Sequence, residues 1–327
     1  LSKTEGSQKS LELLYEQKSA ILKNLITFTR DTAEMKVYEN ERDFAQTYPF
    51  IPYQFNLLQK VFQGIRGNAA SEKHMSEGER SLLGSFQETA MKFMDYEVGT
   101  LIPFSAFYKT IESFLDSNIR SVIIQASKNN ELKEFDIEIL KLLFLLKYVK
   151  EIKANVENMT TLMASHIDED KIETEDKIKE SLRRLISQTL IQQNGEEYIF
   201  LANDEQDVNR DIKKTFIETK EILEKLGKIV FEEIYRSDKF RYPKTKKDFI
   251  FNKYVDEQPI KNSSSEIGIR IITPYNDLGG DMSQIELKNI SLRENNVIVK
   301  INSTDISFIS EIEESLQITK YIRMSSK

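Results

Sequence analysis

Two charged residues near the C-terminus, Glu286 and Lys288, have the spacing that metal-dependent nucleases use to cut phosphodiesters. The apolar residues Ile285 and Leu287 alternate with them, and this alternation predicts a half-buried strand. Residues two apart on a strand project from the same face, so the carboxylate and the ammonium group would lie together. With an aspartate they would hold Mg²⁺ and activate water. The candidate third residues are Asp256, Asp277 and Asp281.

The same pair also has a simpler interpretation, as solvent-facing charges on an alternating strand. We therefore keep an autonomous nuclease module as an alternative function. The sequence offers few residues for other kinds of catalytic or metal site, because it has no cysteine and only two histidines, His74 and His166. Both histidines lie in polar surroundings, which predicts surface positions. It also has no Gly-x4-Gly-Lys-Ser/Thr phosphate loop, so we expect this chain alone neither to bind ATP tightly nor to be catalytic.

Charge and hydropathy limit the partners and the environment that the chain can have. Its 46 Lys and Arg against 53 Asp and Glu give a net charge of −7, so any nucleic-acid contact must be local. The most apolar stretch, Leu140–Val149, includes Lys147 and is much shorter than the roughly 20 residues that span a bilayer, which predicts no membrane segment. The lack of cysteine fits a reducing cytoplasm. The start at Leu-Ser-Lys indicates a piece of a longer protein.

A run of helices and a hairpin in the middle of the chain predicts a winged helix–turn–helix. Helical periodicity covers Phe135–Val149, Asn155–Ser165 and Thr174–Gln188. Two short apolar runs then flank Asn194-Gly195, the strongest short-range signal for a β-hairpin. Three helices followed by a hairpin give the winged-helix order.

The third of these helices carries the cations that would contact DNA. They are Lys177, Lys179, Arg183 and Arg184. Four acids, Glu173, Glu175, Asp176 and Glu180, balance them, and Glu196 and Glu197 make the wing acidic. A neutral helix beside an acidic wing binds phosphates poorly, so we favour a packing or protein-contact role and keep DNA binding as an alternative. A second basic run, Lys239–Lys247 with Phe240 and Tyr242, is interpreted as a solvated linker, with phosphate or base contact as its alternative.

The remaining patterns predict a mainly α protein with a smaller C-terminal α/β module. Amphipathic helices are expected at 10–31, 53–66, from 78 onward, at 104–125 and at 207–235. Residues 32–47 and 236–247 are expected to be connectors. Alternation predicts strands at 267–271, 285–288 and 297–301, before a helix at 306–323. The expected domains are 1–45, 46–127, 128–212 and 213–327.

Five runs of the sequence together form a specific pattern: Tyr48–Gln59 with Arg66, Ser76–Leu83, Leu143–Lys150, Glu157–Met159 and Asn194–Gln206. They resemble BrxC, the large P-loop ATPase family of BREX bacteriophage-defence systems, and the related PglY proteins. The resemblance covers roughly residues 40–275 and lacks the nucleotide-binding Walker motifs of the family. It implies a middle piece of such an ATPase.

Pro52-Tyr53 and, later, Gly78-Glu79-Arg80 precede the predicted winged helix. This order resembles the lid of origin-recognition-like AAA+ ATPases, which has an aromatic-Pro-Tyr helix start and a later helix opening Gly-Asp-x-Arg, followed by a winged helix. The sequence departs from that pattern because Arg80 directly follows the acidic residue. The missing position would turn the side chain by about 100°. The resemblance implies that Arg80 is a sensor arginine for the γ-phosphate. An ordinary surface arginine paired with Glu77 or Glu79 is the alternative.

The favoured function is therefore a regulatory or assembly region of a BREX AAA+-like ATPase, comprising lid, winged helix and α/β module. The resemblance implies ATP and Mg²⁺ for the parent protein, and other BREX components and its own ATPase core as partners. It also implies an oligomeric full-length protein. DNA is a partner only in the winged-helix alternative.

Overall fold

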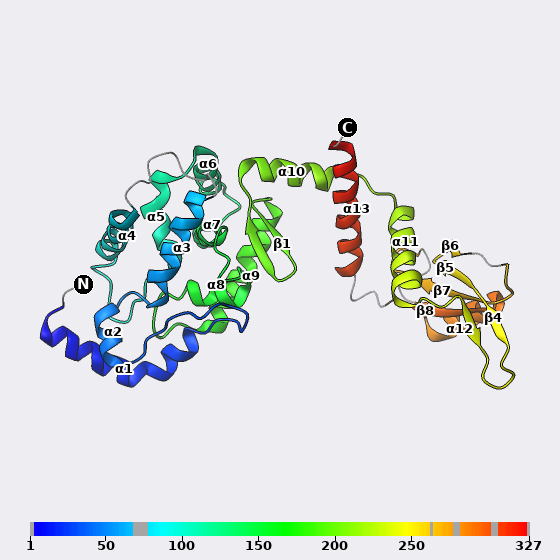
Figure 1. Ribbon diagram of the computed structural model, residues 1–327, viewed down its shortest axis with the longest axis horizontal. Coiled ribbons are helices and arrows are strands. Elements are labelled where there is room, and N and C mark those ends of the chain that lie inside the picture. Colours follow the sequence, from blue (N-terminus) through cyan, green and yellow to red (C-terminus); the bar gives the residue numbers. More distant parts are fainter. Residues whose placement is uncertain (1–2, 68–77, 262–263, 277–281, 302–306, 326–327) are drawn as a thin grey trace. The chain divides into compact units, whose positions relative to one another are not determined.

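The chain folds into two compact units, residues 1–207 and 208–327, each described here by itself. The structure, a computed structural model, describes residues 3–67, 78–261, 264–276, 282–301 and 307–325, and for 78–81 only the backbone. Helices predominate, and strands are concentrated in the second unit (Figure 1). The expected mainly α composition with a small C-terminal α/β part is confirmed.

The first unit begins with four helices. They are α1 (Glu5–Leu25), α2 (Glu41–Thr47), α3 (Tyr53–Gly67) and α4 (Gly78–Lys92). Helix α1 starts earlier than its apolar pattern predicts, because Thr4 caps it by accepting a hydrogen bond from the Ser7 backbone N–H. Asn40 caps α2 in the same way, within a segment expected to be a connector. A capping side chain satisfies an orphan backbone N–H, so these short polar signals define helix starts that hydrophobic periodicity misses.

The expected helix over 104–125 is broken into shorter pieces. They are a 3₁₀ turn (Phe104–Phe107), α5 (Tyr108–Ile111), a second 3₁₀ turn (Glu112–Phe114) and α6 (Ser117–Ala126). The break lies at Leu115 and Asp116, because the Asp116 carboxylate caps a new helix through the Asn118 backbone N–H.

Three helices and a hairpin complete the first unit in the predicted order. They are α7 (Glu134–Leu146), α8 (Val156–Leu162), α9 (Lys171–Ser187), β1 (Ile191–Asn194) and β2 (Glu197–Phe200). Asn194 pairs with Glu197, so the turn residues are Gly195 and Glu196 rather than Asn194 and Gly195. Gly195 has φ +60°, the conformation for which glycine is preferred at the first turn position. One hydrophobic core extends from Leu11 through α7 to Phe200.

A close helix contact inside this core gives a test of packing. Gly64 of α3 lies against Tyr148, and a Cβ atom at Gly64 would approach the Tyr148 Cβ to 2.6 Å and its carbonyl oxygen to 2.8 Å. Because backbone atoms cannot move aside easily, Gly64→Ala is expected to cost about 1–3 kcal/mol of stability. The matched control is Gly84→Ala in α4, where no described atom beyond the helix's own backbone and the two chain neighbours lies within 4 Å of the new methyl group. That change should raise stability by up to about 1 kcal/mol. Urea unfolding measures the stability of both variants. Equal unfolding midpoints for Gly64→Ala and the wild type would contradict the close contact with Tyr148.

Helix α10 (Asn203–Lys214) spans the boundary between the units, and the second unit continues with α11 (Thr219–Lys228) and a π-helical segment (Ile229–Ile234). The prediction of one helix over 207–235 is therefore wrong. The chain breaks after Lys214 because Glu218 starts a new helix through a capping box, in which its N–H donates to the Glu221 carboxylate at 3.0 Å.

The second unit contains a four-stranded sheet with the order β6-β5-β7-β8. Its strands are β5 (Asn252–Val255), β6 (Gln258–Lys261), β7 (Gly268–Ile272) and β8 (Asn296–Lys300). Strands β5, β7 and β8 are parallel, and β6 forms an antiparallel edge. Helix α12 (Gln284–Glu294) connects β7 to β8, and α13 (Ser307–Ser325) follows. Ile222 and Leu226 of α11, Val255, Ile271, Ile309 and Ile312 share a second core.

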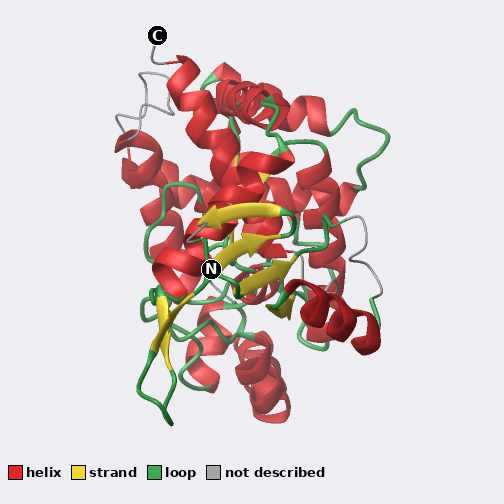
Figure 2. Cartoon of the chain, turned by 90° about the vertical axis from the view of Figure 1, so that its right-hand side faces the viewer, coloured by secondary structure: helices red, strands yellow, loops and turns green. Residues whose placement is uncertain are grey.

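Two further strands, β3 (Lys239–Arg241) and β4 (Asp248–Ile250), form a separate antiparallel hairpin (Figure 2). The interpretation of 236–247 as a linker without structure is therefore wrong. All side chains of residues 236–247 are exposed, so packing against a core does not impose an alternating apolar pattern on this segment.

Candidate functional site

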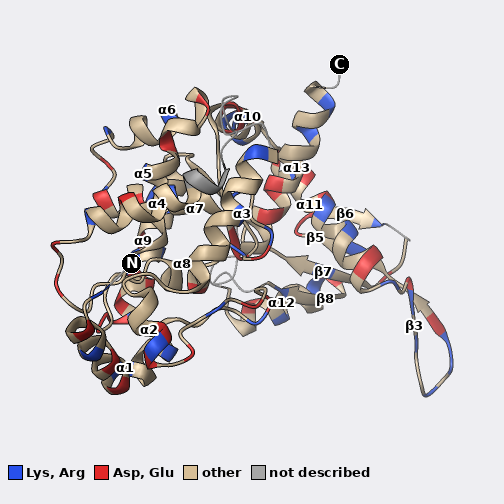
Figure 3. Ribbon diagram, turned by 60° about the vertical axis from the view of Figure 1, so that its left-hand side comes forward, with Lys and Arg blue, Asp and Glu red and all other residues tan. Residues whose placement is uncertain are grey.

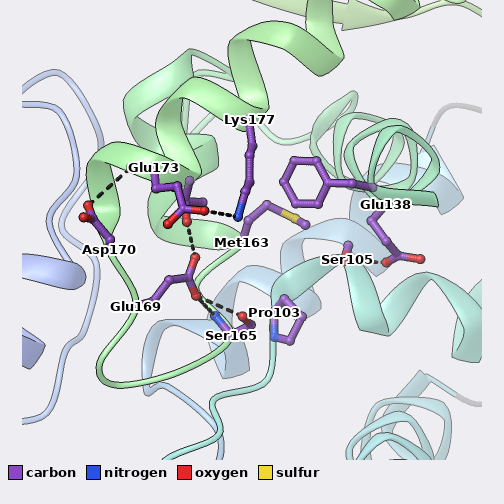
Figure 4. Close-up of a pocket in the computed structure, with 11 residues that line it drawn as sticks. Pro103, Ser105, Glu138, Met163, Ser165, Glu169, Asp170, Glu173 and Lys177 are labelled. Carbon is purple, nitrogen blue, oxygen red and sulfur yellow. Dashed lines mark hydrogen bonds and ion pairs between the residues drawn. The ribbon is translucent and has the colours of Figure 1, made fainter. Parts of the chain in front are cut away.

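The most detailed candidate site in the first unit is a pocket at the N-terminal end of α9 (Figure 4). Asp170 caps this helix by accepting hydrogen bonds from the backbone N–H groups of Ile172 and Glu173. Glu173 and Lys177 follow on one helix face, because positions four apart are neighbours on a helix surface. The pocket has a volume of about 350 Å³.

The pocket floor is apolar and its rim is charged. Pro103, Phe135 and Met163 supply the apolar surface, from three segments far apart in the sequence. The rim has four carboxylates and one ammonium group, those of Glu138, Glu169, Asp170, Glu173 and Lys177. The site therefore combines an apolar floor with a net negative edge.

Hydrogen bonds hold these rim residues in place. Glu169 accepts from the Ser165 backbone N–H at 2.7 Å and from the Ser165 hydroxyl at 2.9 Å, and the Thr174 hydroxyl donates to its other oxygen. Glu173 lies 2.7 Å from the Lys177 ammonium group, and this contact raises the pKa of Lys177. Figure 4 shows Glu173 and Lys177 projecting from α9 and paired with each other. In the described part of the chain, no three His, Cys, Asp or Glu residues come together as a metal site.

The cations of α9 are largely paired with acids of the same unit. Besides Lys177, Lys179 lies 2.7 Å from Glu175 and 3.6 Å from Asp176. Arg184 makes two hydrogen bonds of 2.7 Å to the carboxylate of Asp136 on α7. Arg183 is exposed and has no ion pair with any residue that the structure describes. Three of the four predicted phosphate contacts are thus engaged within the protein.

The Arg184–Asp136 pair connects α9 to the start of α7. Asp136 is fully buried and also accepts a hydrogen bond from the Lys133 backbone N–H at 2.8 Å. Burial opposes its ionisation, but the guanidinium of Arg184 and the backbone donor outweigh this effect and hold the pKa of Asp136 below its usual value. Sequence spacing gives no sign of this pair, because 48 residues separate its members.

Arg80 occupies the third residue of α4, and the helix expected from 78 onward is confirmed. The structure describes no side chain there, and Ser76 and Glu77, part of the expected capping pattern and ion pair, lie outside the described residues. The sensor assignment of Arg80 therefore stays a prediction. Arg66 lies exposed in the last turn of the preceding helix, α3.

The strand expected to carry Glu286 and Lys288 does not form, and this part of the nuclease prediction is wrong. Both residues lie in helix α12, where positions two apart point about 200° from each other. Glu286 instead completes a capping box with Ser283, whose N–H donates to its carboxylate at 2.7 Å and holds the pKa of Glu286 below its usual value. Asp256 is buried and accepts hydrogen bonds from Thr273. Asp277 and Asp281 lie outside the described residues.

His166 is half-buried rather than a plain surface residue. Its ring covers Gly99, where an added Cβ would approach the His166 Nε2 atom to 2.7 Å, and its Nδ1 atom accepts a hydrogen bond from the Asp168 N–H. His74 lies outside the described residues.

A small, mostly parallel sheet with covering helices defines the second unit as an α/β domain. Residues 215–327 match the family described as "BREX ATP-binding protein BrxC 4th domain with six-stranded beta sheet". The match supports a BrxC-type protein of BREX systems, as the resemblance implies. Within that range the described residues form six strands, four in one sheet and two in the β3–β4 hairpin.

The family match differs in extent from the resemblance found in the sequence. We expect the resemblance over roughly 40–275, whereas the match starts at 215 and continues to 327. The lid-like and winged-helix interpretations of the first unit therefore stay predictions. No solved structure matches the chain. Among the described residues, no helix is both long and apolar enough to cross a membrane.

Proposed function

We propose that this chain is a regulatory and assembly region of a BREX ATPase, with a lid-like helical part, a winged helix and the BrxC-type C-terminal domain. The match of residues 215–327 to a domain of an ATP-binding BREX protein carries this proposal. ATP and Mg²⁺ would be bound by a P-loop core elsewhere in the parent protein, because this sequence has no Gly-x4-Gly-Lys-Ser/Thr. The partners would be that core and other BREX components, in an oligomeric cytoplasmic assembly.

The geometry of α9 supports a protein-contact role for the winged-helix part. A recognition helix needs free cations for phosphates, but Lys177, Lys179 and Arg184 are engaged with acids. The pocket beside α9 fits a different partner. An apolar floor below four carboxylates suits a lysine or arginine side chain, whose stem packs on apolar surface while its charge meets acids. We infer that a basic side chain of a BREX partner inserts there.

A binding experiment with the P-loop region of the parent protein tests this assignment. We expect the isolated chain to bind that region and to change its ATPase rate, and we expect Glu138→Gln/Glu173→Gln to weaken the complex about tenfold, since it removes two of the four rim charges. Calorimetry measures affinity, and a coupled assay measures hydrolysis. The matched control is Glu175→Gln/Glu180→Gln, two acids of α9 outside the pocket lining. No complex and no change in hydrolysis would contradict the assembly role. An equal loss of affinity in both double variants would contradict the assignment of the pocket as the binding site.

A further inference from the structure

The β3–β4 hairpin presents aromatic side chains on one of its two faces. Phe240 pairs directly with Phe249, and Lys239 and Arg241 pair with Ile250 and Asp248. Because successive strand residues point to opposite faces, Phe240 and Phe249 share a face, and Tyr242, two residues beyond Phe240, continues it. These aromatic side chains are not packed into a core: Phe240 is 51%, Phe249 42% and Tyr242 38% exposed.

The same hairpin carries cations that the protein leaves unpaired. Arg241, Lys244, Lys246 and Lys247 form no ion pair with any residue in the described part of the chain. Of the hairpin cations, Lys239 alone is paired there, with Asp248 at 2.7 Å. Figure 3 shows Lys and Arg recurring along this hairpin. The contrast with α9 is direct, because three of the four α9 cations are engaged within the protein.

Contacts at the base and the tip hold the hairpin in shape. Asp238, just before β3, lies 2.8 Å from Lys253 and 2.6 Å from Lys261 of the sheet, and these contacts lower the pKa of Asp238 to about 2. Lys253 is buried, with the Phe231 and Phe251 rings 5.3 and 5.7 Å away. At the tip, the Tyr242 N–H donates to the Lys247 carbonyl, and the Lys246 N–H donates to the Tyr242 carbonyl, both at 2.8 Å. A surface held in this way loses little freedom when a ligand binds.

We propose that the β3–β4 hairpin binds single-stranded nucleic acid. Bases would stack on Phe240, Phe249 and Tyr242, while the free cations at and beside the tip pair with phosphates. Stacking needs an exposed base face, which a single strand offers and a paired duplex does not. An acidic polypeptide would use the cations but would gain nothing specific from the exposed rings. This proposal concerns the second unit alone and does not depend on the assembly role of the first.

Fluorescence anisotropy with a labelled 20-nucleotide dT strand tests this site on the whole chain. We expect Phe240→Ala/Phe249→Ala to weaken binding about tenfold or more, because each stacked base contributes roughly 1–3 kcal/mol. We expect Lys244→Gln/Lys247→Gln to reduce the slope of log K against log salt by about 1.4, from about 0.7 per phosphate contact on single strands. The rings are exposed, so the variants should fold, which circular dichroism checks.

The matched control is Lys9→Gln/Lys109→Gln, which removes the same charge from two exposed lysines that are paired with Glu5 and Glu112, and it should leave binding unchanged. A duplex of the same length and a poly-glutamate competitor complete the test. Equal affinity of the wild type and the aromatic variant would overturn the proposal. So would tighter binding of the duplex, or displacement of the strand by poly-glutamate at equal charge concentration, which would indicate an acidic protein partner.

Discussion

Arg184→Met is expected to lower the free energy of unfolding by about 3–5 kcal/mol at pH 7, which is the usual cost of removing one partner from a buried ion pair. The substitution keeps an aliphatic chain of similar length but leaves the Asp136 carboxylate buried opposite no cation. Urea unfolding followed by circular dichroism measures the change. The adjacent exposed residue supplies the control, since Arg183→Met should change stability by no more than about 0.5 kcal/mol.

The difference in unfolding free energy between wild type and Arg184→Met should become smaller at acid pH. The pKa of Asp136 is depressed in the folded protein, so the contribution of the ionised pair is fully present above the unfolded value of about 3.9. That contribution is lost as pH falls through the lower folded value. In the variant the carboxylate has no cation and protonates at a higher pH, which relieves its burial. Two results would contradict this role of the pair in connecting α7 to α9. One is a difference in unfolding free energy that does not change between pH 7 and pH 3. The other is equal urea midpoints for both proteins at pH 7.

The second large effect concerns Arg80, in a protein that includes the P-loop core. We expect Arg80→Ala to reduce ATP turnover on the order of 10³-fold while leaving ATP affinity nearly intact, as for other arginines that contact a transferring phosphoryl group. Charge-assisted hydrogen bonds to the γ-phosphate strengthen as negative charge develops, so their loss affects hydrolysis more than ground-state binding. Steady-state hydrolysis and nucleotide binding must both be measured.

Arg66→Ala serves as the control for this change, because Arg66 lies exposed at the end of the preceding helix. It should alter turnover much less. Wild-type turnover in Arg80→Ala, in a preparation whose Walker variants are inactive, would leave Arg80 as a surface arginine and remove the sensor assignment.

Several elements of the fold could be predicted from the sequence. The order α7, α8, α9, β1 and β2, and strand β7, agree with their apolar patterns, and in α9 burial of one face explains the period of 3.6. Strand β8 also forms where alternation predicts it, although Val297 and Val299 are 62% and 48% exposed. Helix α12 shows the opposite case. It buries no residue, and Ile285 is 73% exposed, so the alternation of apolar and charged residues over 285–288 does not reflect a buried face and wrongly predicted a strand. The Ser283–Glu286 capping box indicates the helix instead.

Only the tertiary structure decided which charges are free and which are engaged. Sequence counting found that α9 is neutral, but it could not show that Arg184 reaches a buried aspartate 48 residues away. It equally could not show that the cations of 239–247 stand on an ordered hairpin beside exposed rings. Local patterns record the environment of one segment. The partner of a charged side chain depends on which distant segments the fold brings within about 4 Å, where electrostatic attraction is strong.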